Sequence, residues 1–379
     1  MDILKSFMGL FAKQNESVLG IDIGASAIKV VQIRRKRGRA VLETYGELAL
    51  GPYAGIEMGR ATSLDTPKLI EAVRDILKES KTTTTACGIA LPLSSSLISF
   101  ITIPPVEEKQ LKDVVTIEAR KYIPVPMNEV MLDWSIIPKE DVPLTDSEIA
   151  SGGADGSLLP DQKKKPQDVL VVAIHNEYLN TYQSIATGAG LQPSFYEIEL
   201  FGAIRAVIDQ GLQPVMIVDM GARLTKLYIV ERGILRSSHV INKGGQDITL
   251  AIAQSLSIPI ADAEQQKRAH GLKGGPEHKE LTELITVNLD YIFYEANAVL
   301  LAYQRKYAKN VGKIVMTGGG VLLRGLSDLA KVSFQTEVVY AEPFSKLVTP
   351  AFLNEQFATA GPEFSVAIGI ALRRLSELE

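Results

Sequence analysis

Residues 19–29 read LGIDIGASAIK, and residues 217–227 read IVDMGARLTKL. In each stretch an apolar strand ends in an aspartate, Asp22 or Asp219, and a glycine two residues later allows a tight turn into a second strand. We interpret the two stretches as internal repeats of one β-hairpin. Turns of this kind present backbone N–H groups to an anion, so each hairpin is a candidate phosphate-binding element.

A third segment and one lysine extend this pattern. Residues 314–320 read IVMTGGG, a buried strand ending in three glycines that let a nucleoside lie close to the backbone. Lys29, seven residues past Asp22, returns along the second strand and can place its charge on a phosphate. Asp22 and Asp219, converging from two lobes, can hold a hydrated Mg²⁺ that bridges phosphates. A hairpin turn alone explains one such motif, but the order and spacing of all three favour a joint nucleotide site.

Composition narrows the classes of protein. A chain of 379 residues exceeds what one hydrophobic core usually organises, which predicts two lobes. The net charge of −4 argues against a nucleic-acid binder, whose domain is usually basic. The single cysteine, Cys87, cannot form an internal disulfide and fits a reducing cytoplasm. The four histidines are scattered, without the spacing of a zinc site.

The rest of the pattern alternates buried strands with helices, which predicts an α/β architecture. Strands are expected at 18–23, 27–33, 40–48, 86–91, 130–137, 169–174 and 313–317, and helices at 65–78, 107–122, 176–189, over most of 248–307, and at 362–378. The strand at 169–174 is expected to restart the first lobe after a separate unit that begins near the two consecutive prolines, Pro104 and Pro105. Residues 139–168, rich in Asp, Ser, Gly, Pro and Lys, predict a flexible loop.

The N-terminal residues 1–16 predict a short amphipathic helix with Ile3, Phe7 and Phe11 on one face. They lack the basic region and small-residue cleavage site of a secretory signal. Two interpretations stay open: the helix packs on its own domain, or it docks a partner or the membrane interface.

The three segments resemble the phosphate-1, phosphate-2 and adenosine motifs of the actin, Hsp70 and sugar-kinase superfamily. By this resemblance Lys29 is a phosphate-contacting lysine, and Gly244 and Gly245 belong to the GG-x-D block after phosphate-2. The helix at 263–268 resembles the one that presents an acid and a lysine to adenosine, although a solvated helix face explains Glu264 and Lys267 almost as well. Glu199 falls where a water-orienting acid stands, and an acid at a helix start is also favourable on dipole grounds alone.

The chain most resembles the PilM family of type IV pilus assembly proteins, which are related to FtsA, over nearly its whole length. The particular likenesses are TIPPV at 102–106, IEARKYIP at 117–124 and the block 244–268. The implied fold class is α/β: an actin/Hsp70-like two-lobed ATPase with a 1C subdomain as in FtsA. The expected parts are an N-terminal helix (1–16), subdomain 1A (17–99 and 169–212), 1C (100–168, with the loop 139–168), 2A (213–249 and 311–361), 2B (250–310) and a C-terminal helix on 1A (362–379).

The resemblance implies an ATP-binding scaffold with slow ATPase activity at most. It implies a groove between 1A and 1C for the cytoplasmic N-terminal tail of an inner-membrane partner similar to PilN. The location would be cytoplasmic and peripheral on the inner membrane through that partner; self-association stays open, and no nucleic-acid partner is expected. A sugar- or acetate-type kinase is the competing class, but no motif for its catalytic base is found. An FtsA-like division protein usually ends in a linker and a membrane helix, whereas ALRRL at 371–375 closes this chain.

The expected cofactors of the candidate site are ATP and Mg²⁺. The nucleotide-binding residues are Asp22, Gly24, Ala25, Ser26, Lys29, Asp219, Gly221, Thr225, Gly244, Gly245, Glu264, Lys267, Gly318, Gly319 and Gly320. Asp22 and Asp219 are the Mg²⁺ ligands through water, and Glu199 is the catalytic candidate.

Overall fold

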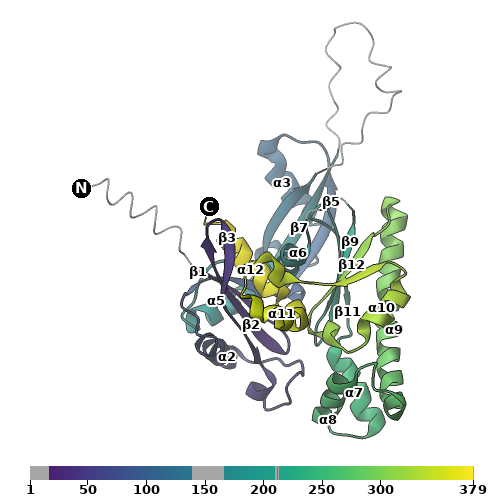
Figure 1. The fold of residues 1–379 in the computed structure, drawn as a ribbon. Helices are drawn as coiled ribbons and strands as arrows, with labels where there is room; N and C mark the ends of the chain where they lie inside the picture. Colours follow the sequence, from purple (N-terminus) through teal and green to yellow (C-terminus); the bar gives the residue numbers. More distant parts are fainter. Residues whose placement is uncertain (1–16, 139–165, 210, 212, 379) are drawn as a thin grey trace, which may run out of the picture. The chain divides into compact units, whose positions relative to one another are not determined.

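The computed structural model describes residues 17–138, 166–209, 211 and 213–378 (Figure 1). The expected N-terminal helix and all but the last residues of the expected loop at 139–168 lie outside this part of the chain. The chain divides into two compact units, Met1–Leu93 with Thr181–Glu379, called here the main unit, and Ser94–Asn180, called the inserted unit.

The first lobe of the main unit is built on a five-stranded sheet in the order β3-β2-β1-β4-β8. Its strands are β1 (Ser17–Ile23), β2 (Ala27–Lys36), β3 (Arg39–Ala49), β4 (Ala86–Leu91) and β8 (Gln192–Ile198). The first three form an antiparallel meander, β4 pairs with β1 in parallel, and β8 pairs with β4 in parallel. Helix α2 (Thr66–Glu79) follows the meander, and the backbone N–H of Lys68 donates to its N-cap, Asp65, at 3.1 Å.

Helices α6 (Glu199–Val207) and α12 (Ser365–Ser376) pack against this sheet. Three glycines permit the contact. A Cβ on Gly20 of β1 would lie 2.0 Å from the carbonyl oxygen of Ala367, and one on Gly369 would lie 1.9 Å from that of Gly202. The expected helix at 362–378 is therefore present, although its first turn, Gly361–Phe364, is a 3₁₀ helix.

The second lobe repeats the first. Its sheet has the order β11-β10-β9-β12-β13, again a three-stranded antiparallel meander extended by two parallel strands. The strands are β9 (Val215–Met220), β10 (Thr225–Glu231), β11 (Ile234–Ile241), β12 (Lys313–Thr317) and β13 (Glu337–Tyr340). The helices are α7 (Gly245–Leu256), α8 (Ile260–His270), α9 (Lys279–Tyr307) and α10 (Leu326–Phe334). Helix α11 (Asn354–Ala360), which comes after β13 in the chain, packs in the core of the first lobe through Phe357. The repeat inferred from two short stretches thus extends over both sheets.

Helix α9 is the longest helix of the part described. Together with the turn before it, Pro276–Tyr307 is the one described segment long and apolar enough to cross a membrane by length and composition. One face of α9 lies in the core of the second lobe through Leu281, Ile285, Leu289 and Phe293. The apolar residues of that face are explained by packing against the sheet of the second lobe, and α10 lies beside α9 (Figure 1).

The inserted unit is a three-stranded antiparallel sheet with a helix. Its order is β5-β7-β6, from β5 (Ser96–Ile103), β7 (Gln167–His175) and β6 (Val130–Ile137). Helix α3 (Glu108–Ala119) packs on it through Leu111 and Val115, and α5 (Asn176–Gly188) leads out of it. The strand expected at 169–174 to restart the first lobe is instead the central strand here. Its uniformly apolar run fits the middle of any sheet, so its sequence did not indicate which one.

Candidate nucleotide site

The two hairpins have the same register. Asp22 lies opposite Lys29 on β1 and β2, and Asp219 lies opposite Lys226 on β9 and β10. In each turn the glycine N–H donates to a carbonyl three residues on, from Gly24 to Ala27 at 3.0 Å and from Gly221 to Leu224 at 2.9 Å. Sequence reasoning singled out Lys29 and missed Lys226. The sequence feature that could have indicated Lys226 is the spacing of seven residues between aspartate and lysine, which is the same in both stretches.

Lys226 joins two carboxylates from different lobes. Its Nζ lies 2.5 Å from Glu199 Oε2 and 3.3 Å from Asp219 Oδ2. Glu199 begins α6 in the first lobe, and its other oxygen accepts the backbone N–H of Leu93 at 2.7 Å. Glu199 and Asp219 are only 8% and 7% exposed. The structure therefore brings Glu199 to the β9–β10 hairpin, with a lysine between it and the aspartate.

The charges of this cluster act on Asp22. Burial raises the pKa of Asp22 to about 7, with a further contribution from Glu199, while Lys29 and Lys226 oppose the shift. Burial by itself lowers the pKa of Lys226, but Asp219 and Glu199 outweigh it and hold that pKa well above its ordinary value. The lysine stays charged, whereas Asp22 titrates near neutral pH.

Lys29 has different partners from Lys226. Its Nζ lies 3.2 Å from Glu47 Oε1 on β3 and 3.6 Å from Glu363 Oε2, ahead of α12. Burial lowers the pKa of Lys29, but Glu47, Glu363 and Asp22 raise it further, so the net shift is upward. Burial also raises the pKa of Glu363. Lys29 is thus a charged group held in the first lobe beside Asp22.

The triple glycine lies against the β9–β10 hairpin. Gly318 has a φ of +85°, and a Cβ there would lie 2.5 Å from Asp219 Oδ1. A Cβ on Gly320 would lie 2.8 Å from the Cβ of Met220, and one on Gly319 would lie 3.2 Å from Glu363 Oε2. At Gly318 and Gly320 only a residue without a side chain fits, and the positive φ of Gly318 is one that glycine adopts without strain.

The Gly244–Gly245 segment closes over the same hairpin. The N–H of Gly245 donates to the carbonyl of Gly221 at 3.0 Å, and a Cβ on Gly244 would lie 2.6 Å from the carbonyl oxygen of Ala222. Thr225 is fully buried, and its hydroxyl donates to the carbonyl of Lys243 at 2.8 Å. This hydrogen bond of the Thr225 hydroxyl connects β10 to the residue before the Gly244–Gly245 segment.

Glu264 and Lys267 on α8 form one polar network beside these glycines. Lys267 Nζ lies 2.7 Å from Glu264 Oε2 and donates to the carbonyl of Gly245 at 2.9 Å. Both also contact the hydroxyl of Thr249. Burial and Arg268 lower the pKa of Lys267, against the effect of Glu264. The pair faces the glycine segment, so the solvated-face alternative does not describe it.

The first lobe reaches this network through the loop after β3. The N–H of Ala61 donates to Gln246 Oε1 at 2.7 Å, and a Cβ on Gly59 would lie 3.0 Å from Glu264 Oε1. The carbonyl of Ala25 accepts the N–H of Thr62, and that of Ser26 accepts the N–H of Leu50. The turn containing Ala25 and Ser26 is thereby fixed to the loop that meets α7 and α8.

The donor set fits a hydrated divalent cation. Asp22, Asp219 and Glu199 place three carboxyl groups beside Lys29 and Lys226; burial raises the pKa of Asp22, and Glu199 raises it further. Within the described ranges, no three carboxylate, imidazole or thiolate groups are placed to hold an ion directly. Contact through water is what Mg²⁺ favours in such sites, so Asp22 and Asp219 would hold it by way of its water shell. When bound, the ion would offset the negative charge of the phosphates.

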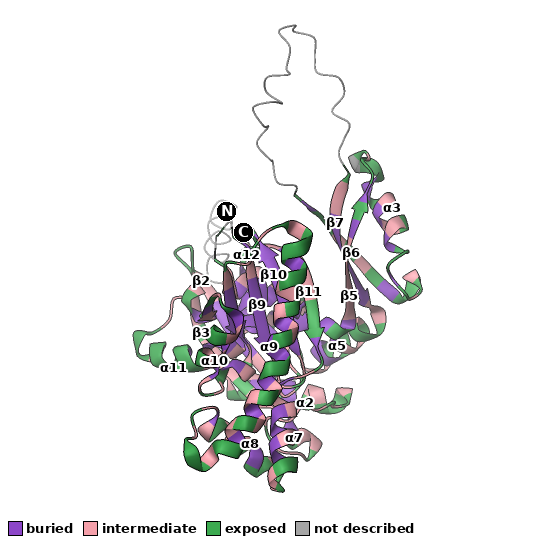
Figure 2. Cartoon of the chain, turned by 90° about the vertical axis from the view of Figure 1, so that its right-hand side faces the viewer, coloured by how far each residue is buried: buried purple, intermediate pink, exposed green. Residues whose placement is uncertain are grey.

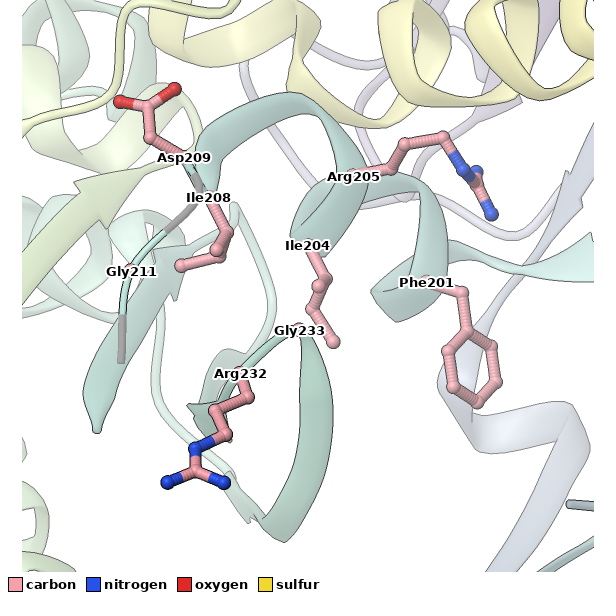
Figure 3. A pocket seen from close by; sticks show the side chains of 8 residues that line it. All are labelled: Phe201, Ile204, Arg205, Ile208, Asp209, Gly211, Arg232 and Gly233. Atoms are coloured by element: carbon pink, nitrogen blue, oxygen red, sulfur yellow. The ribbon is translucent and has the colours of Figure 1, made fainter. Parts of the chain in front are cut away.

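A cavity of about 760 Å³ lies away from these residues, between α6 and the β10–β11 turn. Figure 3 shows Ile204 pointing from α6 toward Gly233, with Phe201 and Arg232 on either side. None of the candidate nucleotide-binding residues lines it. It is therefore a separate feature of the main unit.

Comparison with known proteins identifies the family. The model of the type IV pilus assembly protein PilM matches residues 20–150 and 157–375. The chain belongs to the PilM family. It is also 25% identical to the cell division protein FtsA of Staphylococcus epidermidis over 92% of this chain and 77% of that protein. It is 24% identical to FtsA of Neisseria meningitidis over 94% of this chain and 90% of that protein.

Two solved structures are similar in fold to this chain. The PilM–PilN type IV pilus biogenesis complex has a TM-score of 0.77 and 25% identity, covering 94% of this chain and 98% of that one. MreB5 of Spiroplasma citri bound to ADP has a TM-score of 0.51 and 12% identity, covering 96% and 97%. The family resemblance and the actin-like fold predicted from the sequence are confirmed.

Proposed function

We propose that this chain is an ATP-binding scaffold of type IV pilus assembly whose cleft takes Mg·ATP. The observation that carries the proposal is the convergence of two Asp-x-Gly-x₄-Lys hairpins from two lobes, with Gly244, Gly245 and Gly318 against the second. The hairpin N–H groups and Lys29 would hold phosphates, and Asp22 and Asp219 would hold the hydrated ion. The ADP-bound MreB5 relative supports a nucleotide on this fold.

Glu199 is suited to orient a water and poorly suited to fast catalysis. Its carboxylate is engaged by Lys226 on one oxygen and by the N–H of Leu93 on the other, so both oxygens are held in place and only part of their lone pairs is free for a water. A general base needs a free lone pair directed at the attacking water. Slow hydrolysis follows, with nucleotide acting mainly as a ligand that joins the lobes.

The proposed partner is the cytoplasmic N-terminal tail of an inner-membrane protein similar to PilN, and the proposed docking region is the inserted unit. The PilM–PilN complex among the similar structures supports it. In the three-stranded sheet β6 is an outer strand, and Met131, Asp133 and Ile136 on it are exposed. An extended tail can add to such an edge through main-chain hydrogen bonds, with side chains choosing the partner. Location at the inner membrane would follow from this contact.

The nucleotide site is tested by calorimetric titration of Mg·ATP into wild type, Asp22→Ala and Asp219→Ala. Loss of one charged or ion-mediated contact is expected to weaken binding by roughly tenfold to a hundredfold in each variant. Glu79→Gln, an exposed carboxylate at the end of α2, is the matched control and should bind as wild type does. Unchanged affinity in both aspartate variants would refute the assignment.

The partner surface is tested separately by capture of an immobilised PilN-like tail peptide. Met131→Asp on β6 should weaken capture at least tenfold, whereas Met58→Asp, at a methionine of the main unit that is even more exposed (68% against 44%), should not. Equal capture by both variants would contradict docking at β6. A sugar- or acetate-type kinase would instead reveal itself by phosphoryl transfer to a small metabolite in a substrate screen.

A further inference from the structure

Helix α9 carries a second apolar face that the core does not explain. Val287, Tyr291, Tyr294, Ala298 and Leu301, called here the α9 stripe, are all exposed. Val287 is 69% exposed, Tyr294 71% and Leu301 51%. Figure 2 shows the exposed side of α9 toward the viewer. Four large side chains in one line are more than the single exposed apolar residues that surfaces normally carry.

The spacing of the α9 stripe is regular. Successive members lie four, three, four and three residues apart, which is the repeat that keeps a seam of side chains facing a neighbouring helix. The face buried against the sheet runs instead through Leu281, Ile285, Leu289 and Phe293. The α9 stripe is therefore directed away from the core of its own lobe, in the position of a helix-pairing seam.

Opposite charges stand at the two ends of this seam. Glu283 lies four residues before Val287 and Arg305 four residues after Leu301, so both extend the same line, and both are exposed. Glu283 pairs with Lys279 on its own helix at 3.6 Å, between two exposed side chains. In the described part of the chain no ion pair is recorded for Arg305. An exposed ion pair within one helix, such as that of Glu283 with Lys279, contributes little to stability, so Glu283 is available to another cation.

We propose that the α9 stripe docks a second copy of this chain in antiparallel orientation, on a two-fold axis at Tyr294. With Tyr294 opposite itself, Val287 lies opposite Leu301 of the second copy, and Glu283 lies opposite its Arg305. The contact is self-complementary, as a two-fold interface requires. A parallel pairing would set Glu283 against Glu283 and Arg305 against Arg305, which is repulsive.

The charges also decide against a lipid surface as the occupant. Glu283 and Asp290 are exposed along this side of α9, and carboxylates oppose binding to anionic headgroups.

From Glu283 to Arg305 the seam is about 33 Å long at 1.5 Å per residue, roughly three heptads. One helix pair of this size is small beside a permanent interface, so the dimer is weak and concentration-dependent.

Disulfide trapping tests the register directly. Cys87 is the single cysteine of the chain and is buried, so added cysteines react alone. On mild oxidation Tyr294→Cys should form a covalent dimer at least tenfold faster than Val332→Cys, a control 76% exposed on α10. Val287→Cys and Leu301→Cys should cross-link when mixed and only slowly when separate. Rates equal to that of the control would overturn the proposal.

Charge reversal gives the second readout, in sedimentation of the full chain at about 1–500 μM, the range for a small interface. Glu283→Arg and Arg305→Glu should each reduce dimer formation at least tenfold, and the double variant should restore it. Failure of the double variant to restore the dimer, or a monomer throughout in wild type, would refute antiparallel pairing. Wild-type co-flotation with protein-free vesicles, lost in Tyr294→Asp, would show a lipid occupant and overturn it too.

Discussion

Replacing Asp22 by asparagine removes a carboxylate whose ionisation the folded protein opposes. Burial raises its pKa from 3.8 to about 7. Between these two values the folded state holds a proton that the unfolded chain has already lost. The stability of wild type therefore falls as pH rises from about 4 through 7, because the folded state must give up that proton. Asparagine has nearly the same shape and no such proton, so the variant lacks this loss.

The size of the effect follows from the two pKa values. Between pH 5 and pH 8 the shift makes wild type lose about 2–3 kcal/mol of unfolding free energy relative to Asp22→Asn, at about 1.4 kcal/mol per pKa unit. Urea unfolding without nucleotide or Mg²⁺, followed by far-UV circular dichroism at both pH values, measures this difference. Glu79→Gln should run parallel to wild type.

Fluorescence offers an internal reference for that assay. Trp134 is the single tryptophan and lies on β6, so its emission follows the inserted unit, whereas Asp22 lies in the main unit. The pH-dependent gap is expected in the dichroism transition of the main unit. A constant stability difference between wild type and Asp22→Asn from pH 5 to pH 8 would refute the electrostatic account of the cluster.

Three further predictions concern the same site. Lys226→Met should lower stability by about 3–5 kcal/mol because Glu199 and Asp219 lose their shared cation, and Mg²⁺ should raise the melting temperature of the variant more than that of wild type; equal shifts would contradict this. Affinity for Mg·ATP should rise from pH 6 to pH 8 with net proton release, measured by calorimetry in two buffers, because Asp22 must ionise to hold the ion; Asp22→Asn should show no such slope. Gly318→Ala should lower both the melting temperature and the nucleotide affinity, since its Cβ would meet Asp219 Oδ1 at a positive φ, while Gly211→Ala, with open space around it, should not; similar losses in both would show that the close approach is unimportant.

Sequence patterns predicted the local backbone elements of the candidate site, namely its two hairpins and the glycine segment after β12. A tight turn or a close backbone approach restricts the residue type within a few positions, which is why the sequence pattern indicated Asp22, Asp219 and the glycines at 318–320. The register that sets each aspartate opposite a lysine is likewise contained in one hairpin. These elements were predictable from short windows of the chain.

The missed features depend on distant segments. Nothing near Lys226 in sequence indicates that its ammonium meets Glu199 of the other lobe, because that contact exists only once α6 and β10 are brought together. The strand β7 fits either sheet by composition, and its pairing with β5 and β6 is decided by long-range contacts. Tertiary partners, unlike turns, leave little trace in a single sequence.

The inserted unit enters and leaves the chain at one place. Ser96, near its start, pairs with Ile174, near its end, as neighbours on β5 and β7. A module whose two ends are side by side can be exchanged for another without stretching the chain on either side. Recombination can therefore replace this module while Asp22, Lys226 and Asp219 keep their places, so the inserted unit can change in evolution independently of the two hairpins.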